Sequence, residues 1–176
     1  ENFVPAATVP ENGGVSVSST SLTVSFDESN RGRVTRITTA KGEELYSPTE
    51  TDDLFSLTFT REEDFSKTTH VSPSAAKSFS VTRLENGIAL VYGNCGEAAE
   101  KVVCRVTAMP GEREVRWRIA TVPRNGWVLE SVSFPRLVLA GKLGANAGDD
   151  ALVSGSAKSG IFRNPMSLPK EHWPIC

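Results

Sequence analysis

Apolar side chains occupy every second position through much of this chain. The stretch SLTVSF places Leu22, Val24 and Phe26 on one side and serine or threonine on the other. The same alternation runs through LFSLTFT, SFSVTR, GIALVYG, KVVCRVTA, REVRWRIA and WVLESVSFP. A period of two residues is that of a β-strand with one buried face, and β-branched and aromatic side chains suit such strands. The pattern therefore predicts an all-β fold.

Turn signals separate these runs, in the segments DESNRGR, KGEE, SPTETDD, ENG, MPGE and PRNG. The pair Asn86-Gly87 predicts a tight hairpin turn, because both residues tolerate positive φ. The best helical candidate, SPSAAKSF near Ser74, is short. About ten short strands at hairpin spacing bury one face each most simply in an antiparallel two-layer β-sandwich.

Length and charge narrow the class of protein further. A chain of 176 residues suits one domain, and a net charge of −2 with both signs interspersed offers no basic field for nucleic acid. No apolar run is long enough to cross a membrane. Residues 1–14 lack periodicity and are expected to form a flexible tether before a single sandwich domain at 15–176. The start at Glu1 fits removal of a signal peptide or a cut in a longer chain.

Two of the three cysteines flank the segment GEAAEKVV. A hairpin there would place Cys95 opposite Cys104 and Gly93 opposite Val106, with both cysteines on one face of the sheet. A cross-strand disulfide is one expectation, and it would indicate an oxidising compartment. Two reduced, buried thiols are the other. Cys176 has no evident partner, and no cysteine has a histidine context for catalysis.

Adjacent carboxylates occur at Asp52-Asp53, at 62–64 and at Asp149-Asp150. Neighbouring residues of a strand point to opposite faces, so these doublets are interpreted as solvated turn residues rather than catalytic pairs. Calcium at the Asp149 loop is a weak alternative, because no ligand spacing there matches a known site. His70 and His172 stand far apart and form no metal or triad pattern. We therefore predict no catalytic residue and no cofactor.

Aromatic rings matter where a ligand is a sugar, because flat rings stack on pyranose faces. Trp117 is in phase with Val115 and Ile119 and is predicted to lie in the core. Trp127 starts a strand after RNG, so it lies either in the core or at the rim. Trp173, in PKEHWPIC, has a context that suggests exposure. Trp127 and Trp173 are the candidate sugar-binding rings.

Two longer segments carry a family resemblance. SLTVSFDESNRGRVTRITTAKGEELYSP and REVRWRIATVPRNGWVLESVSFPRLVL resemble the galactose-mutarotase-like supersandwich domains that precede catalytic barrels in bacterial glycoside hydrolases. The resemblance covers most of residues 20–165 and rests on element order and spacing. It implies a supersandwich-like domain, incomplete at this length, from the amino-terminal part of a larger protein. The histidine and acid set of the mutarotase enzymes has no counterpart here.

The resemblance implies that DDALVSGSAKSGIFRNP, residues 149–165, forms a strand, a loop and a strand facing a neighbouring catalytic domain. Arg163 and Asn164 offer donors and acceptors that suit sugar hydroxyls. Alternatively, Asn164-Pro165 only starts a turn and Arg163 pairs with an acid.

The expected function is a non-catalytic β-sandwich domain of a secreted or periplasmic bacterial carbohydrate-active enzyme. Its partner would be a downstream catalytic domain of the same polypeptide, or carbohydrate. Two alternatives stay open. One is a free-standing carbohydrate-binding module. The other is a structural or adhesive sandwich that binds a protein, or itself, through an open sheet edge.

Overall fold

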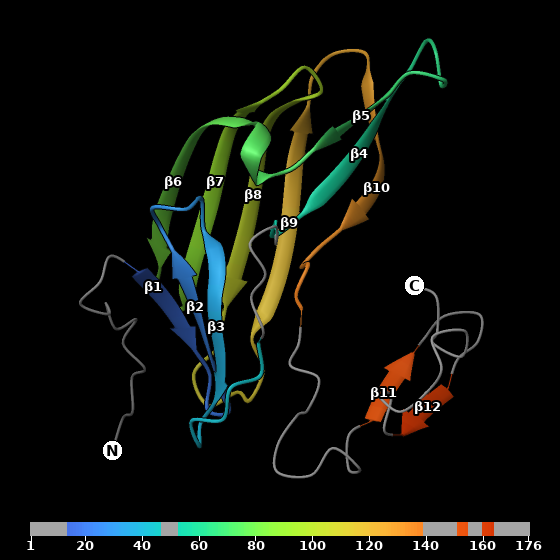
Figure 1. Cartoon of the computed structure of the whole chain (residues 1–176). Helices are drawn as coiled ribbons and strands as arrows, with labels where there is room; N and C mark the ends of the chain where they lie inside the picture. Colours follow the sequence, from blue (N-terminus) through green and yellow to red (C-terminus); the bar gives the residue numbers. More distant parts are fainter. Residues whose placement is uncertain (1–13, 47–52, 139–150, 155–159, 164–176) are drawn as a thin grey trace.

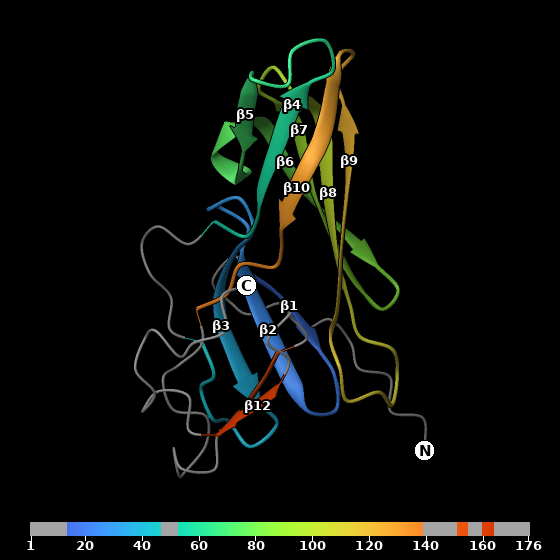
Figure 2. The same cartoon turned by 90° about the vertical axis from the view of Figure 1, so that its right-hand side faces the viewer.

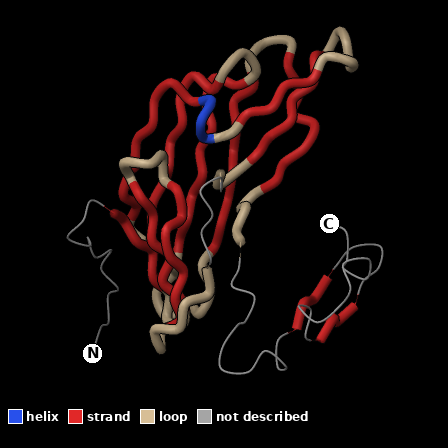
Figure 3. The backbone as a smooth tube through the Cα atoms, viewed as in Figure 1, coloured by secondary structure: helices blue, strands red, loops and turns tan. Residues whose placement is uncertain are grey.

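The protein is described by a computed structural model, which covers residues 14–46, 53–138, 151–154 and 160–163. The described chain is almost entirely antiparallel β-structure, as Figure 3 shows, so the predicted all-β class is confirmed. Of the expected helical segment near Ser74, only the 3-10 turn η1 is helical. The strands are β1 (Gly14–Ser18), β2 (Leu22–Asp27), β3 (Arg33–Thr39), β4 (Ser56–Arg61), β5 (Thr68–Val71), β6 (Ala76–Leu84), β7 (Gly87–Cys95), β8 (Ala99–Thr107), β9 (Arg116–Pro123), β10 (Trp127–Ser133), β11 (Ala151–Ser154) and β12 (Gly160–Arg163), with η1 at Pro73–Ala75.

The strands β1 to β10 form a two-layer sandwich. One layer is the four-stranded sheet β6-β7-β8-β9, and the other consists of two three-stranded sheets, β1-β2-β3 and β10-β4-β5. Figures 1 and 2 show both smaller sheets on the same side of the four-stranded sheet, one toward each of its ends. Strands β11 and β12 form a separate antiparallel pair.

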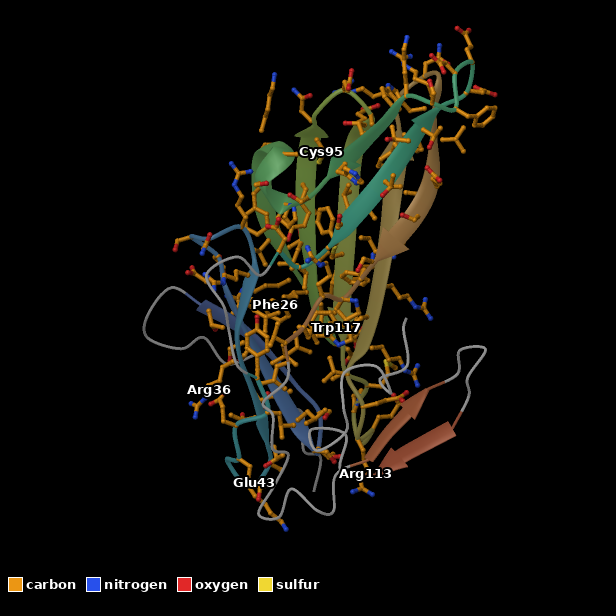
Figure 4. The ribbon with its side chains drawn as sticks, turned by 45° about the vertical axis from the view of Figure 1, so that its right-hand side comes forward. Phe26, Arg36, Glu43, Cys95, Arg113 and Trp117 are labelled. Atoms are coloured by element: carbon orange, nitrogen blue, oxygen red, sulfur yellow. The ribbon has the colours of Figure 1, made fainter. Side chains whose placement is uncertain are left out.

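The core lies between the two layers and draws on all three sheets. Phe26 of β2 and Trp117 of β9 pack with ring centroids 5.7 Å apart, and Figure 4 shows these two side chains between the sheets. Tyr92 of β7 packs edge-on against Phe55 at 5.1 Å. Trp117 is half-buried against this cluster, which confirms its predicted core position.

The loop between β2 and β3 connects the sheet β1-β2-β3 to the four-stranded sheet through hydrogen bonds. The Tyr92 hydroxyl donates to the carbonyl oxygen of Arg31 at 2.9 Å. The Arg31 guanidinium donates in turn to the carbonyl oxygens of Pro73, at 3.2 Å, and Ala76. Asp27 begins the loop by accepting hydrogen bonds from Ser29, which lower the pKa of its carboxyl group. The buried tyrosine and the loop thus hold each other in place.

The predicted tight turn between β6 and β7 exists, but its two loop residues are Glu85 and Asn86, and Gly87 already pairs with Leu84. Gly87 has a φ of 155°, and a Cβ there would lie 2.0 Å from the carbonyl oxygen of Val106. The glycine is therefore required by the close approach of β8.

In strand β10 the observed burial differs from the predicted alternation. In the run WVLESVSFP the alternation predicts that Val128, Val132 and Phe134 share the buried face, but Val128 and Val132 are 46% and 48% exposed. Trp127 is only 8% exposed and belongs to the core. The large ring buries more apolar area than a valine, and a register shift between Leu129 and Ser131 interrupts the alternation.

The predicted pairing of Cys95 with Cys104 is wrong. Cys95 lies opposite Ala99, and Cys104 lies opposite Leu90. Gly96, with a φ of 69°, turns the chain directly after Cys95, so β8 begins five residues before Cys104. Both thiols are free and buried, as the alternative interpretation expected.

Burial raises the pKa of both the Cys95 and the Cys104 thiol. Since the thiolate is the reactive form, neither thiol should react with Ellman's reagent in the folded protein. We expect a Cys176→Ser variant to show no reactive thiol when folded, and both thiols after unfolding in guanidinium without reductant. An unfolded protein that still shows none would mean that the two cysteines are joined.

Candidate ligand-binding surface

Three turns meet at the end of the sandwich that lies at the top of Figure 1. They are the β7–β8 turn (96–98), the β9–β10 turn (124–126) and the β4–β5 hairpin (62–67). The backbone N–H of Arg124 donates to the carbonyl oxygen of Ala98 at 2.8 Å, and that of Glu62 donates to Gly126 at 3.0 Å. These bonds join turns from both layers, which makes this end of the sandwich a rigid platform.

The side chain of Arg124 strengthens the same junction. Its Nη2 donates to Oδ1 of Asn94 at 2.7 Å, and its Nε donates to the carbonyl oxygen of Gly96 at 3.3 Å. Beneath the junction, the Arg61 guanidinium lies 4.6 Å from the centroid of the Trp127 ring, within the range of a cation–π contact. Arg124 and Asn94 are therefore held in fixed positions beside the outer face of the large sheet.

The outer face of the large sheet carries a hollow next to this junction. In its end row, Ser78, Gly93, Lys101 and Val122 lie side by side across β6, β7, β8 and β9. Gly93 has no side chain and its neighbour Ser78 is small, while longer side chains stand around them. The result is a hollow of about 600 Å³ lined by Ser78, Phe79, Ser80, Val91, Gly93, Asn94, Glu100, Lys101 and Arg124.

The lining combines hydroxyl groups, an amide, one carboxylate, an ammonium group and a guanidinium group. Such a set can donate to and accept from a polyhydroxylated ligand at several points. Val91 and Gly93 add an apolar floor. A glycosidase needs two carboxyl groups, whereas Glu100 is the one carboxylate among the described residues that line the hollow.

The β4–β5 hairpin presents an exposed aromatic ring. Phe65 is 76% exposed at a tip ordered by Asp64, whose carboxylate accepts from the Ser66 hydroxyl at 2.6 Å. That hydrogen bond lowers the pKa of Asp64. The acids at 62–64 are thus turn residues, as expected, and Phe65 was not predicted because one aromatic in a polar turn carries no periodic signal.

The residues predicted as sugar contacts lie elsewhere or outside the described chain. Trp127, expected either in the core or at the rim, lies in the core beside Arg61 and is 8% exposed. Arg163 ends β12, which pairs with β11 as the predicted strand–loop–strand, but its side chain is not among those described. Asn164, Trp173 and the acids Asp149 and Asp150 lie outside the described residues.

Sequence reasoning missed the hollow itself. A glycine inside an otherwise well-patterned strand, Gly93, was its one available signal, because such a glycine marks a bulge or a close approach. Ser78, Ser80 and Lys101 look like ordinary solvent-facing positions until the strand order is known.

In the described residues, no group of three or more His, Cys, Asp or Glu side chains could hold a metal ion. His70 is exposed on β5, with its Nδ1 3.2 Å from the Thr58 hydroxyl. Within the described ranges, no helix has the length and apolar character needed to cross a membrane.

No known protein family matches the chain, and no curated protein or solved structure is significantly similar to it. The resemblance to galactose-mutarotase-like domains therefore stays a prediction.

Proposed function

We propose that this chain is a non-catalytic β-sandwich domain of a secreted carbohydrate-active protein, and that the hollow on β6–β8 contacts the glycan. In the larger protein that the sequence resemblance implies, the domain supports a catalytic domain of the same polypeptide and shapes one side of its glycan site. A free-standing carbohydrate-binding module would use the same surface.

The observation that carries this proposal is the hollow beside the Arg124–Asn94 junction. Its polar groups come from three strands and a turn, and the 2.7 Å hydrogen bond between Arg124 and Asn94 fixes two of them before any ligand arrives. Groups fixed in advance cost less entropy when a ligand binds.

Filling the hollow should weaken glycan binding without unfolding the protein. We expect Gly93→Val to weaken binding about tenfold or more, because its side chain would occupy the floor beside Ser78. Valine suits a strand, and the Ser78 hydroxyl nearest to the new Cβ can rotate away. Binding can be measured on a glycan array and then by calorimetry on the best ligand.

A distant control is Gly42→Val, at a glycine where a new Cβ meets no neighbouring atom but whose φ of 84° strains any side chain, a strain that Gly93 does not carry. It tests whether strain in a distant turn alone changes binding, and we expect no change. Unaltered glycan binding by Gly93→Val would remove the hollow from the proposal.

A protein-binding role through a sheet edge is the second candidate, and strand β10 favours it. In the described structure, β10 is an edge strand of its sheet and exposes Val128 and Val132. Exposed edges of this kind can pair with another chain.

Sedimentation equilibrium of the wild-type chain and of a Val128→Lys/Val132→Lys variant separates the two candidates. We expect both proteins to sediment as monomers, because the register shift within β10 disrupts a regular edge. A wild-type dimer that the lysines dissociate would favour association through β10 instead.

A further inference from the structure

The outer face of the large sheet is positively charged along two of its strands. The register places Thr82, Ala89, Arg105 and Arg118 in one row, and Thr107 beside Arg116 in the next. Lys101 lies on the same face, in the end row with Gly93. In the rows of Lys101 and of the Arg105–Arg118 pair, the positions on β6 and β7 hold hydroxyl or small side chains, so the charged residues of these rows are cations. Glu100 is the carboxylate beside them in the lining of the hollow.

Arg105 and Arg118 are direct cross-strand partners. Side chains in this position lie about 5 Å apart at Cβ, and like charges there repel each other. Both arginines are exposed, and neither side chain has a hydrogen bond or ion pair with any described residue. Neighbouring Arg116, in contrast, pairs with Glu112 at 2.9 Å and Glu114 at 2.8 Å.

The two guanidinium groups are therefore open to an acidic ligand, because no described residue of the chain pairs with them. A guanidinium group offers a planar fork of donors that matches the oxygens of a carboxylate or sulfate. Lys101 stands four residues along β8 from Arg105, about 13 Å away along the strand. That separation exceeds one sugar ring, so the cations can meet acid groups on successive units of a chain.

We infer that the ligand of this face is an acidic polysaccharide, bearing carboxylate or sulfate groups, which lies along the small side chains of β6 and β7. One end of the bound segment occupies the hollow, and its acid groups contact Arg105, Arg118 and Lys101. This inference rests on the proposed function and specifies its ligand class. The short side chains of Ser78, Ser80 and Thr82 are exposed, and Gly93 has no side chain, so an extended chain can lie over β6 and β7 beside the cations.

Binding can be measured by calorimetry on the whole chain with four polymers: polygalacturonate, dextran sulfate, neutral dextran and poly-L-glutamate. We expect polygalacturonate or dextran sulfate to bind about tenfold or more tightly than dextran, since charge-assisted hydrogen bonds are the strong ones. Which of the two acidic polymers binds better identifies the acid group. Binding should weaken as salt rises, because these cations are exposed.

The test variant is Arg105→Gln/Arg118→Gln, which should weaken acidic-polymer binding about tenfold or more. It also removes a like-charge repulsion, so its thermal midpoint should be unchanged or higher. The matched control is Arg36→Gln/Arg83→Gln, which changes the net charge equally at residues paired with Glu44 and Glu28. The control should bind the acidic polymer within about twofold of wild type.

The outcomes are distinguishable. Equal binding of neutral and acidic glycans, abolished by Gly93→Val but unaffected by Arg105→Gln/Arg118→Gln, would overturn this inference and leave the proposed function standing. Binding of poly-L-glutamate as tight as that of the acidic glycans would replace the glycan with an acidic protein segment. No binding of any glycan would overturn both proposals.

Discussion

The inner face of the four-stranded sheet is the constraint on which the rest of the structure depends. Strands β6, β7 and β8 are each nine residues long, or about 30 Å, whereas β1 to β5 have four to seven residues. Apolar side chains cover the long face from Val106 near one end to Cys95 near the other. Those of β7 and β8 are buried, and those of the flanking strands β6 and β9, such as Phe79 and Trp117, are partly buried. No single short sheet can cover that length, so two small sheets lie along it. Aromatic contacts such as Phe26 with Trp117 and Phe55 with Tyr92 fix each small sheet in place.

The same alternation that buries one face leaves the other free for a ligand. Each inward residue of β8 has a neighbour that points out, so Val102, Cys104 and Val106 oblige Lys101, Val103 and Arg105 to face solvent. The junction of Arg124 with Asn94 and the β7–β8 turn then closes one end of this face. The positions of the cationic rows thus follow from the alternation that forms the core, and the turns at one end complete the hollow.

The strands and the fold class could be predicted from sequence because each strand carries its own period. The sequence predictions failed where contacts between distant parts of the chain determine the structure. The turn after Cys95 depends on positive φ at Asn94 and Gly96, and it moves the two cysteines out of the register that spacing alone favoured. Trp127 lies opposite Arg61 of β4, whose guanidinium contacts its ring, and the pattern of β10 alone does not show this partner. The hollow joins residues from Ser78 to Arg124, so it appears only once strand order and register are known. Arg105 and Arg118 likewise become a pair only through the register.

The most direct test of this account compares two adjacent valines on the central strand β8. Val102 is fully buried on the inner face, and Val103 lies on the outer face. Replacing valine with threonine keeps the shape and adds a hydroxyl, which is costly only where water is excluded. The account predicts that Val102→Thr lowers the free energy of unfolding, measured with urea, by about 1–3 kcal/mol, while Val103→Thr changes it by less than about 0.5 kcal/mol. Equal losses at both positions would mean that another layer covers the outer face, and the proposed ligand surface would not exist.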